Sequence, residues 1–217
     1  MIKYVYLILL FVLTSFCMSG QSTVITHVNV IPLEAEPLVL SNQTVFITGD
    51  RISDIVPFKE AHVKLKAAII DGTGKYLIPG LADSHVHLPS GSLDELSMQE
   101  YFNLCLASGI TTMRSMRGEG RHIGLRDSIR KKLFLAPDLY ISALLPSDST
   151  VTSEQLKAFI KKSKKEGWDF VKYLHGLTPP LFDSVALYCK QSNIKLAGHV
   201  FANDLQTAIK AGQSSVE

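Results

Sequence analysis

Two histidines separated by one residue are the clearest candidates for chemistry in this sequence. They lie in the run Asp83-Ser84-His85-Val86-His87, and side chains two residues apart on a strand point to the same face. His85 and His87 therefore converge, and two neighbouring imidazoles favour a divalent metal ion over being protonated together. A pair of surface histidines is the alternative. Asp83 lies on the same face, where it either orients a ligand or accepts a backbone hydrogen bond.

A lysine and a further histidine lie in later strand-like segments. Lys172 is flanked by apolar residues, and an unpaired buried ammonium is costly, so a buried Lys172 must be paired, deprotonated or modified. The alternative is a strand-end lysine whose ammonium reaches water. His199 follows Gly198 at the end of another apolar run, where a glycine indicates close approach of backbone or ligand.

Strands that alternate with helices must position these residues. Apolar or β-branched runs predict strands at 77–88, 110–116, 139–145, 169–174, 195–201 and 214–216. The segments between them are helix-like, at 93–108, 123–135, 153–166, 180–193 and 203–211. This alternation predicts parallel β-α-β units in an α/β fold, either as an open sheet or as part of a barrel.

Residues 20–76 follow a different pattern, with short strands separated by turns. Strands are expected at 24–31, 44–48, 51–56 and 67–70, and Gly49-Asp50 has the composition of a two-residue hairpin turn. We expect a small antiparallel β unit here, followed by an α/β domain over residues 77–217.

The first 19 residues resemble a targeting segment. Lys3 precedes an apolar run, 5–13, that is shorter than the roughly 20 residues of a membrane-spanning helix. Small residues follow, and cleavage after Ser19 predicts an exported protein of the periplasm or extracellular space, with no membrane span after cleavage. An uncleaved anchor is the alternative. A lipoprotein at Cys17 is disfavoured by the bulky Phe16 before it.

Charge and cysteine content exclude several classes of protein. Among 217 residues, 22 are basic and 20 acidic, and a net charge of +2 offers no general attraction for nucleic acid. The lysine-rich run 161–165 ends a predicted helix, where cations favour the helix dipole and face water. Cys105 and Cys189 lie in different predicted helices, which indicates two buried apolar residues rather than a disulfide.

A series of motifs in the right order resembles the metal-dependent amidohydrolase superfamily. The segment 45–55 resembles its N-terminal sandwich hairpin, 75–87 its first barrel strand with the metal-binding histidines, and 109–114 its second strand. Val171-Lys172 is similar to the strand-four lysine and Gly198-His199 to the strand-five histidine, and 208–217 resembles the approach to strand six. The most similar branch holds the imidazolonepropionase-related and Xaa-Pro dipeptidase-like members.

The resemblance implies strands 1 to 6 of a (β/α)8 TIM barrel, preceded by part of a small β-sandwich. It implies that His85 and His87 bind one metal ion, that carboxylated Lys172 bridges two, and that His199 binds the second. Two zinc ions would then hold a bridging hydroxide that attacks a carbonyl carbon. The implied activity is hydrolysis of a carbon–nitrogen bond in a small molecule, such as a cyclic amide or a prolyl dipeptide.

The resemblance also leaves parts of the site outside this sequence. In the superfamily another histidine ligand ends strand six and a catalytic aspartate ends strand eight, and both are expected beyond Glu217. We therefore expect a fragment of a larger hydrolase, with a non-catalytic fragment or one half of a split enzyme as alternatives, and a homo-oligomer left open. His175 and Arg117 would lie at the substrate-binding rim, or else face solvent as ordinary loop residues.

Overall fold

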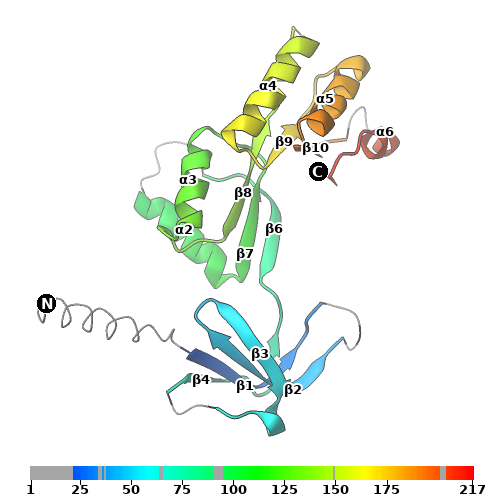
Figure 1. The fold of residues 1–217 in the computed structure, drawn as a ribbon. Helices are drawn as coiled ribbons and strands as arrows, with labels where there is room; N and C mark the ends of the chain where they lie inside the picture. The colour runs from blue at the N-terminus through cyan, green and yellow to red at the C-terminus, as the bar shows by residue number, and fades with distance from the viewer. Residues whose placement is uncertain are drawn as a thin grey trace, which may run out of the picture. The chain divides into compact units, whose positions relative to one another are not determined.

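The chain consists of two compact units, which end and begin at Pro79 and Gly80 (Figure 1). The computed structural model describes residues 22–33, 36, 38–63, 66–89, 95–148, 150–200 and 204–217, so the predicted targeting segment lies outside the described residues. Each unit contains one sheet. No helix in the described part of the chain is long and apolar enough to span a bilayer.

The first unit is a five-stranded mixed sheet. β1 (Ser22–Val30) buries alternate side chains and pairs antiparallel with β2 (Leu40–Thr48), which forms the predicted hairpin with β3 (Arg51–Pro57). β4 (Ala68–Asp71) and β5 (Tyr76–Leu77) pair with β1 in parallel. The prediction of a purely antiparallel unit is therefore wrong, because β4 and β5 run in the same direction as β1.

The second unit alternates strands and helices as predicted. Its strands are β6 (Leu81–Val86), β7 (Ile110–Ser115), β8 (Asp138–Leu144), β9 (Phe170–Tyr173), β10 (Lys195–Gly198) and β11 (Ser215–Val216). Its helices are α2 (Glu95–Ala107), α3 (Arg121–Arg130), α4 (Ser153–Glu166), α5 (Pro179–Gln191) and α6 (Leu205–Lys210). The strands are parallel and lie in the order in which they occur in the chain. This consecutive order is the winding of a barrel, whereas a doubly wound sheet reverses direction at a switch point.

Two differences from the predicted boundaries have clear causes. The predicted strand 77–88 is divided by 78–80, so that Leu77 pairs in the first sheet and β6 starts the second. The predicted helix 123–135 begins at Arg121 and ends at Arg130, since Lys132 has a positive φ of 58°. The segment after it turns back, and Phe134 packs edge-on against the ring of Phe102.

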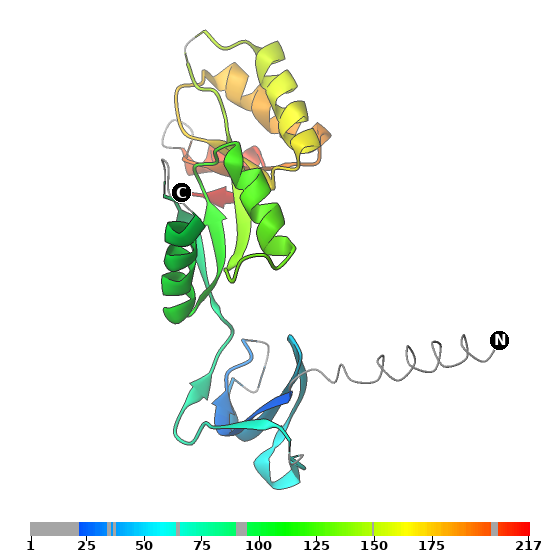
Figure 2. The ribbon, with the colours of Figure 1, turned by 90° about the vertical axis from the view of Figure 1, so that its left-hand side faces the viewer.

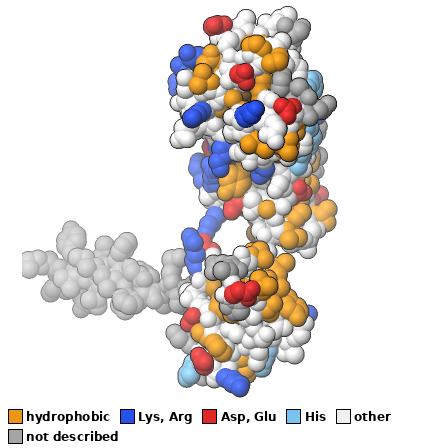
Figure 3. Space-filling view, turned by 90° about the vertical axis from the view of Figure 1, so that its right-hand side faces the viewer, with side chains coloured by type: hydrophobic (Ala, Val, Ile, Leu, Met, Phe, Trp, Pro, Cys, Tyr) orange, Lys and Arg blue, Asp and Glu red, His pale blue; other side chains and the backbone are white. Residues whose placement is uncertain are grey.

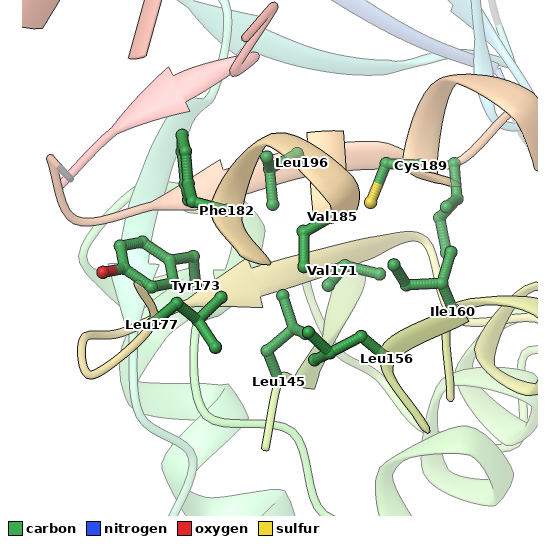
Figure 4. Packing of buried hydrophobic residues seen from close by; sticks show 11 residues of the cluster. Leu145, Leu156, Ile160, Val171, Tyr173, Leu177, Phe182, Val185, Cys189 and Leu196 are labelled. Carbon is green, nitrogen blue, oxygen red and sulfur yellow. The ribbon is translucent and has the colours of Figure 1, made fainter. Parts of the chain in front are cut away.

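One face of the six-stranded sheet is covered by the helices. Side chains of α2 and α3 pack on outward-facing residues of β7 and β8, such as Met113 and Ile141. The ribbon of these helices can be followed in Figure 2. Side chains of α4 and α5 pack on Val171, Tyr173 and Leu196 of β9 and β10 (Figure 4). Because successive strand residues point to opposite faces, the residues between these positions lie on the uncovered inner face.

The sheet is strongly curled. In a flat sheet, the five steps from β6 to β11 would separate these edge strands by about 24 Å. Instead, Nδ1 of His85 lies 2.8 Å from Oε2 of Glu217, which directly follows β11. Arg114 of β7 likewise reaches Ser215 of β11, with 2.9 Å between Nη2 and Oγ. The inner face is therefore a concave surface on which residues from both edges meet, the geometry of a partial barrel.

The surface and the cysteines agree with the composition argument. Lysines 161, 162, 164 and 165 of α4 are exposed, and in Figure 3 basic, acidic and hydrophobic side chains are interspersed on the α/β unit. Cys105 and Cys189 are both buried and unbridged, as predicted.

Replacing Phe182 tests the packing of the helical layer. This side chain is fully buried and its ring meets that of Tyr173 edge-on, with 5.0 Å between centroids. Phe182→Ala should lower the free energy of unfolding by about 3–5 kcal/mol, because it leaves a cavity between α5 and β9. Leu187→Ala, at a half-exposed position of the same helix, is the control and should change it by less than about 0.5 kcal/mol in urea denaturation. Equal losses in the two variants would contradict this packing.

Candidate metal centre

The alternation of β6 separates its two histidines from the helical core. Val86 is buried against α2, while His85 and His87 on either side of it point to the inner face, with 5.5 Å between their ring centroids. Partial burial, followed by the positive charges of His85, Arg117 and Lys172, lowers the pKa of His87 below its ordinary value. A neutral imidazole is the form that binds a metal ion, so this surrounding favours ligation.

Lys172 lies in the middle of the concave face. It alternates with Val171 and Tyr173, which point outward into the helical core, and only 2% of its surface is exposed. Its ammonium nitrogen is buried without a hydrogen-bond partner. Burial lowers the pKa of Lys172, the carboxylate of Glu217 opposes this shift, and the charge of Arg114 adds to it. The alternative of a lysine reaching water is therefore wrong, because β9 lies in the interior of the sheet.

A glycine brings His199 close to the neighbouring strand. Gly198 ends β10 with a φ of 135°, and a Cβ there would lie 2.0 Å from the carbonyl oxygen of Tyr173. His199 then donates its backbone N–H to that same oxygen at 3.0 Å. Its Nδ1 lies 3.2 Å from the main-chain oxygen of Glu217. The sequence predicted that Gly198 allows a close approach of backbone or ligand. The structure shows such an approach, by the backbone of Tyr173.

Asp83 has the simpler of its two predicted roles, because its Oδ1 accepts the backbone N–H of His85 at 3.2 Å. The two loop residues predicted for substrate contact, Arg117 after β7 and His175 after β9, are both exposed. The charge of Arg117 contributes to the lowered pKa of His87. His175 lies in an exposed loop, and its contact with substrate stays a prediction.

Sequence reasoning missed a polar network next to the predicted ligands. Glu217, whose side chain is only 7% exposed, accepts from His85 and from the hydroxyl of Ser215, and Arg114 lies beside both. The signal was present in the two-residue alternation, which puts Arg114 on the inner face and both Ser215 and Glu217 on the inner side of the last strand. Neither residue type nor spacing revealed that the two edges of the sheet would meet.

These residues are compatible with a metal centre that includes a modified lysine. Among the described residues, no three histidine, cysteine, aspartate or glutamate side chains are grouped closely enough to hold a metal ion. The buried nitrogen of Lys172, which has no hydrogen-bond partner, is the feature that a further group would satisfy. A carboxylated lysine would supply two oxygen ligands at that position and would remove the buried cation.

Comparisons with known proteins agree with the motifs. No protein-family model matches the chain. An adenine deaminase of Lysinibacillus sphaericus is 28% identical over 145 residues, which are 59% of this chain and 24% of that protein. A 5'-deoxyadenosine deaminase of Methanocaldococcus jannaschii is 37% identical over 65 residues, which are 28% of this chain and 15% of that protein. This chain thus spans a quarter or less of the length of these two relatives.

The fold matches that of solved hydrolases. The structure of molinate hydrolase superimposes with a TM-score of 0.73 at 17% identity, over 90% of this chain and 57% of that one. Together with the ordered motifs, these similarities place the chain in the amidohydrolase superfamily.

Substituting Gly198 tests whether the strand end that carries His199 needs a glycine. Gly198→Ala should lower the free energy of unfolding by more than about 1 kcal/mol, because the positive φ is strained and the methyl group meets Tyr173. The control is Gly124→Ala in α3, where no atom lies within 4 Å of the added Cβ and a stability gain of up to about 1 kcal/mol is expected. Chemical denaturation measures both, and a neutral Gly198→Ala would refute the close approach.

Proposed function

We propose that the protein is a metal-dependent hydrolase that acts on carbon–nitrogen bonds. The single observation that supports this best is Lys172, a fully buried amine without a partner at the centre of a concave face that also carries three histidines. A fold that only needed stability would place an apolar residue there, because an unpaired buried charge is costly. Perturbed, desolvated groups in such a place are characteristic of functional sites.

The proposal assigns a role to each ligand. His85 and His87 hold one metal ion through their neutral rings, and His199 holds a second. Lys172 joins the two as a carbamate, which forms when its neutral amine adds to CO₂ and releases one proton. A divalent metal ion bound there would lower the pKa of a bound water molecule and would polarise a carbonyl or similar group. Zinc is the metal we propose, since histidine nitrogen and carboxylate-type oxygen are ligands that it accepts.

The substrate class is proposed at two levels. Hydrolysis of a carbon–nitrogen bond in a small molecule is supported by the superfamily and by the deaminase relatives, since deamination also breaks such a bond. A cyclic amide or a prolyl dipeptide is the narrower proposal, which follows from the branch that the motifs resemble. Arg117 is the candidate for a substrate contact, because its charge lies beside His87 on an exposed loop.

Export of the protein, and a β-sandwich built around the sheet of the first unit, remain part of this proposal. A non-catalytic fragment, or one half of a split enzyme, is the competing possibility. It is favoured by the lack of three grouped acidic, histidine or cysteine ligands among the described residues. The two possibilities differ in metal content.

Metal analysis of the purified chain, with Lys172→Ala as the variant, tests the proposal. The unaltered chain, expressed in cells supplied with zinc and bicarbonate, should contain about two equivalents of zinc. Lys172→Ala should lose this zinc because the bridging group is gone. The control is Lys161→Ala, at an exposed position of α4, which should keep its zinc. Carbon-13-labelled bicarbonate should give a carbamate signal in the unaltered chain and in Lys161→Ala, and none in Lys172→Ala.

A chain that binds no zinc would favour the non-catalytic or split possibilities. Adding a C-terminal partner polypeptide would then separate these two, since only the split enzyme gains activity. Full retention of two metal ions by Lys172→Ala would refute the bridging role of the lysine.

A further inference from the structure

We propose that Glu217 is a positioning residue for His85: its carboxylate fixes the ring as the Nδ1–H tautomer and leaves Nε2 free for a metal ion. Arg114 and Ser215 hold that carboxylate in turn. The consequence for metal binding rests on the proposed function, but the tautomer is a property of the chain itself. The proposal concerns residues that neither the motifs nor the comparisons assign.

The first step is the contact between Glu217 and His85. Oε2 of Glu217 lies 2.8 Å from Nδ1 of His85, a short distance typical of a charge-assisted hydrogen bond. An ionised carboxylate can only accept, so Nδ1 must carry the proton. In a neutral imidazole the other nitrogen then has a free lone pair. The ring of His85 is thereby prepared to bind through Nε2.

The second step is the support of the carboxylate from β7 and β11. The hydroxyl of Ser215 donates to Oε1 of Glu217 at 2.9 Å and accepts from Nη2 of Arg114 at 2.9 Å. Nη1 of Arg114 lies 3.7 Å from the same Oε1. A hydroxyl can donate one hydrogen bond while it accepts another, so these contacts form a directed chain from Arg114 through Ser215 to Glu217. The positive charge of Arg114 therefore lies beside the carboxylate that contacts His85.

The third step is the rigidity of this arrangement. The guanidinium of Arg114 lies 4.9 Å from the ring centroid of Phe170, within the range of a cation–π contact. The backbone N–H of Glu217 donates to the carbonyl oxygen of Gly198 at 3.0 Å. Neighbouring strands therefore contact both the guanidinium of Arg114 and the backbone of Glu217.

A role as the counter-ion of Lys172 is the competing explanation for Glu217. Its charge does favour the ammonium form of Lys172, but the nitrogen of Lys172 makes no hydrogen bond in the structure. Both carboxylate oxygens are instead engaged by His85 and Ser215. A carboxylate that binds the outer nitrogen of a histidine ligand orients the ring and raises its basicity, and loss of such a partner typically weakens metal binding by about 10–100-fold.

The tautomer can be measured without metal, by long-range proton–nitrogen NMR of the nitrogen-15-labelled full chain. His85 should be the Nδ1–H tautomer. His122 provides an internal control with the opposite state, because its Nδ1 accepts the backbone N–H of Glu119 at 3.1 Å and its proton must be on Nε2. Glu217→Leu removes the acceptor and should shift His85 toward Nε2–H, while an unchanged His122 reports an intact fold. Glu217→Gln, which keeps a neutral acceptor, should restore part of the Nδ1–H population.

Zinc affinity, measured by competition with a chelating dye, tests the consequence. Glu217→Leu should bind zinc about 10–100-fold more weakly than the unaltered chain. Arg114→Met should also weaken binding, by a smaller factor, because the carboxylate stays but loses its support. Glu100→Gln, at an exposed carboxylate of α2, is the matched control and should bind zinc like the unaltered chain.

Two results would overturn the positioning role. One is Nε2–H at His85 in the unaltered chain, and the other is a Glu217→Leu variant with unchanged tautomer or unchanged zinc affinity. If the unaltered chain takes up no zinc at all, the proposed function fails, and the tautomer of His85 in the two Glu217 variants still decides whether Glu217 positions the ring.

Discussion

The curvature of the six-stranded sheet is the constraint on which the rest of the second unit depends. Parallel strands in consecutive order place all their carboxyl ends at one edge, and the curl turns that edge into a concave surface. Residues that would be about 24 Å apart in a flat sheet are thereby brought into hydrogen-bond contact, as His85 and Glu217 are. Without the curl, the histidines, the lysine and the glutamate would lie in a row with no common centre.

Stability and chemistry are assigned to opposite faces of this sheet. The outward-facing residues of β7 to β10 pack with the helices into two apolar clusters, which supply the burial that a folded unit needs. The inner face carries Arg114, Lys172 and Glu217 at positions that a purely structural sheet would fill with branched apolar residues. The alternation of each strand separates the two roles residue by residue, as Val171 and Lys172 illustrate.

The charged groups on the inner face are buried to different degrees and have different surroundings. Glu217 and Arg114 form a network in which each group has a partner, and this arrangement limits the cost of their burial. Lys172 has no hydrogen-bond partner, and desolvation lowers its pKa. The proposed carbamate would replace this unpaired cation with a group that has partners of its own.

The sequence by itself determined the element types, the two units and the residues closest to the chemistry. Local patterns suffice for this, since the two-residue period puts His85 and His87 on one face and the capping signals bound α4 at the predicted residues. Only the tertiary structure decided that β4 and β5 pair in parallel with β1, that Lys172 is buried, and that Glu217 contacts His85. These facts depend on how the sheets pair and curl. Pairing and curvature join residues far apart in the chain, 132 positions for His85 and Glu217, and no local pattern carries that information.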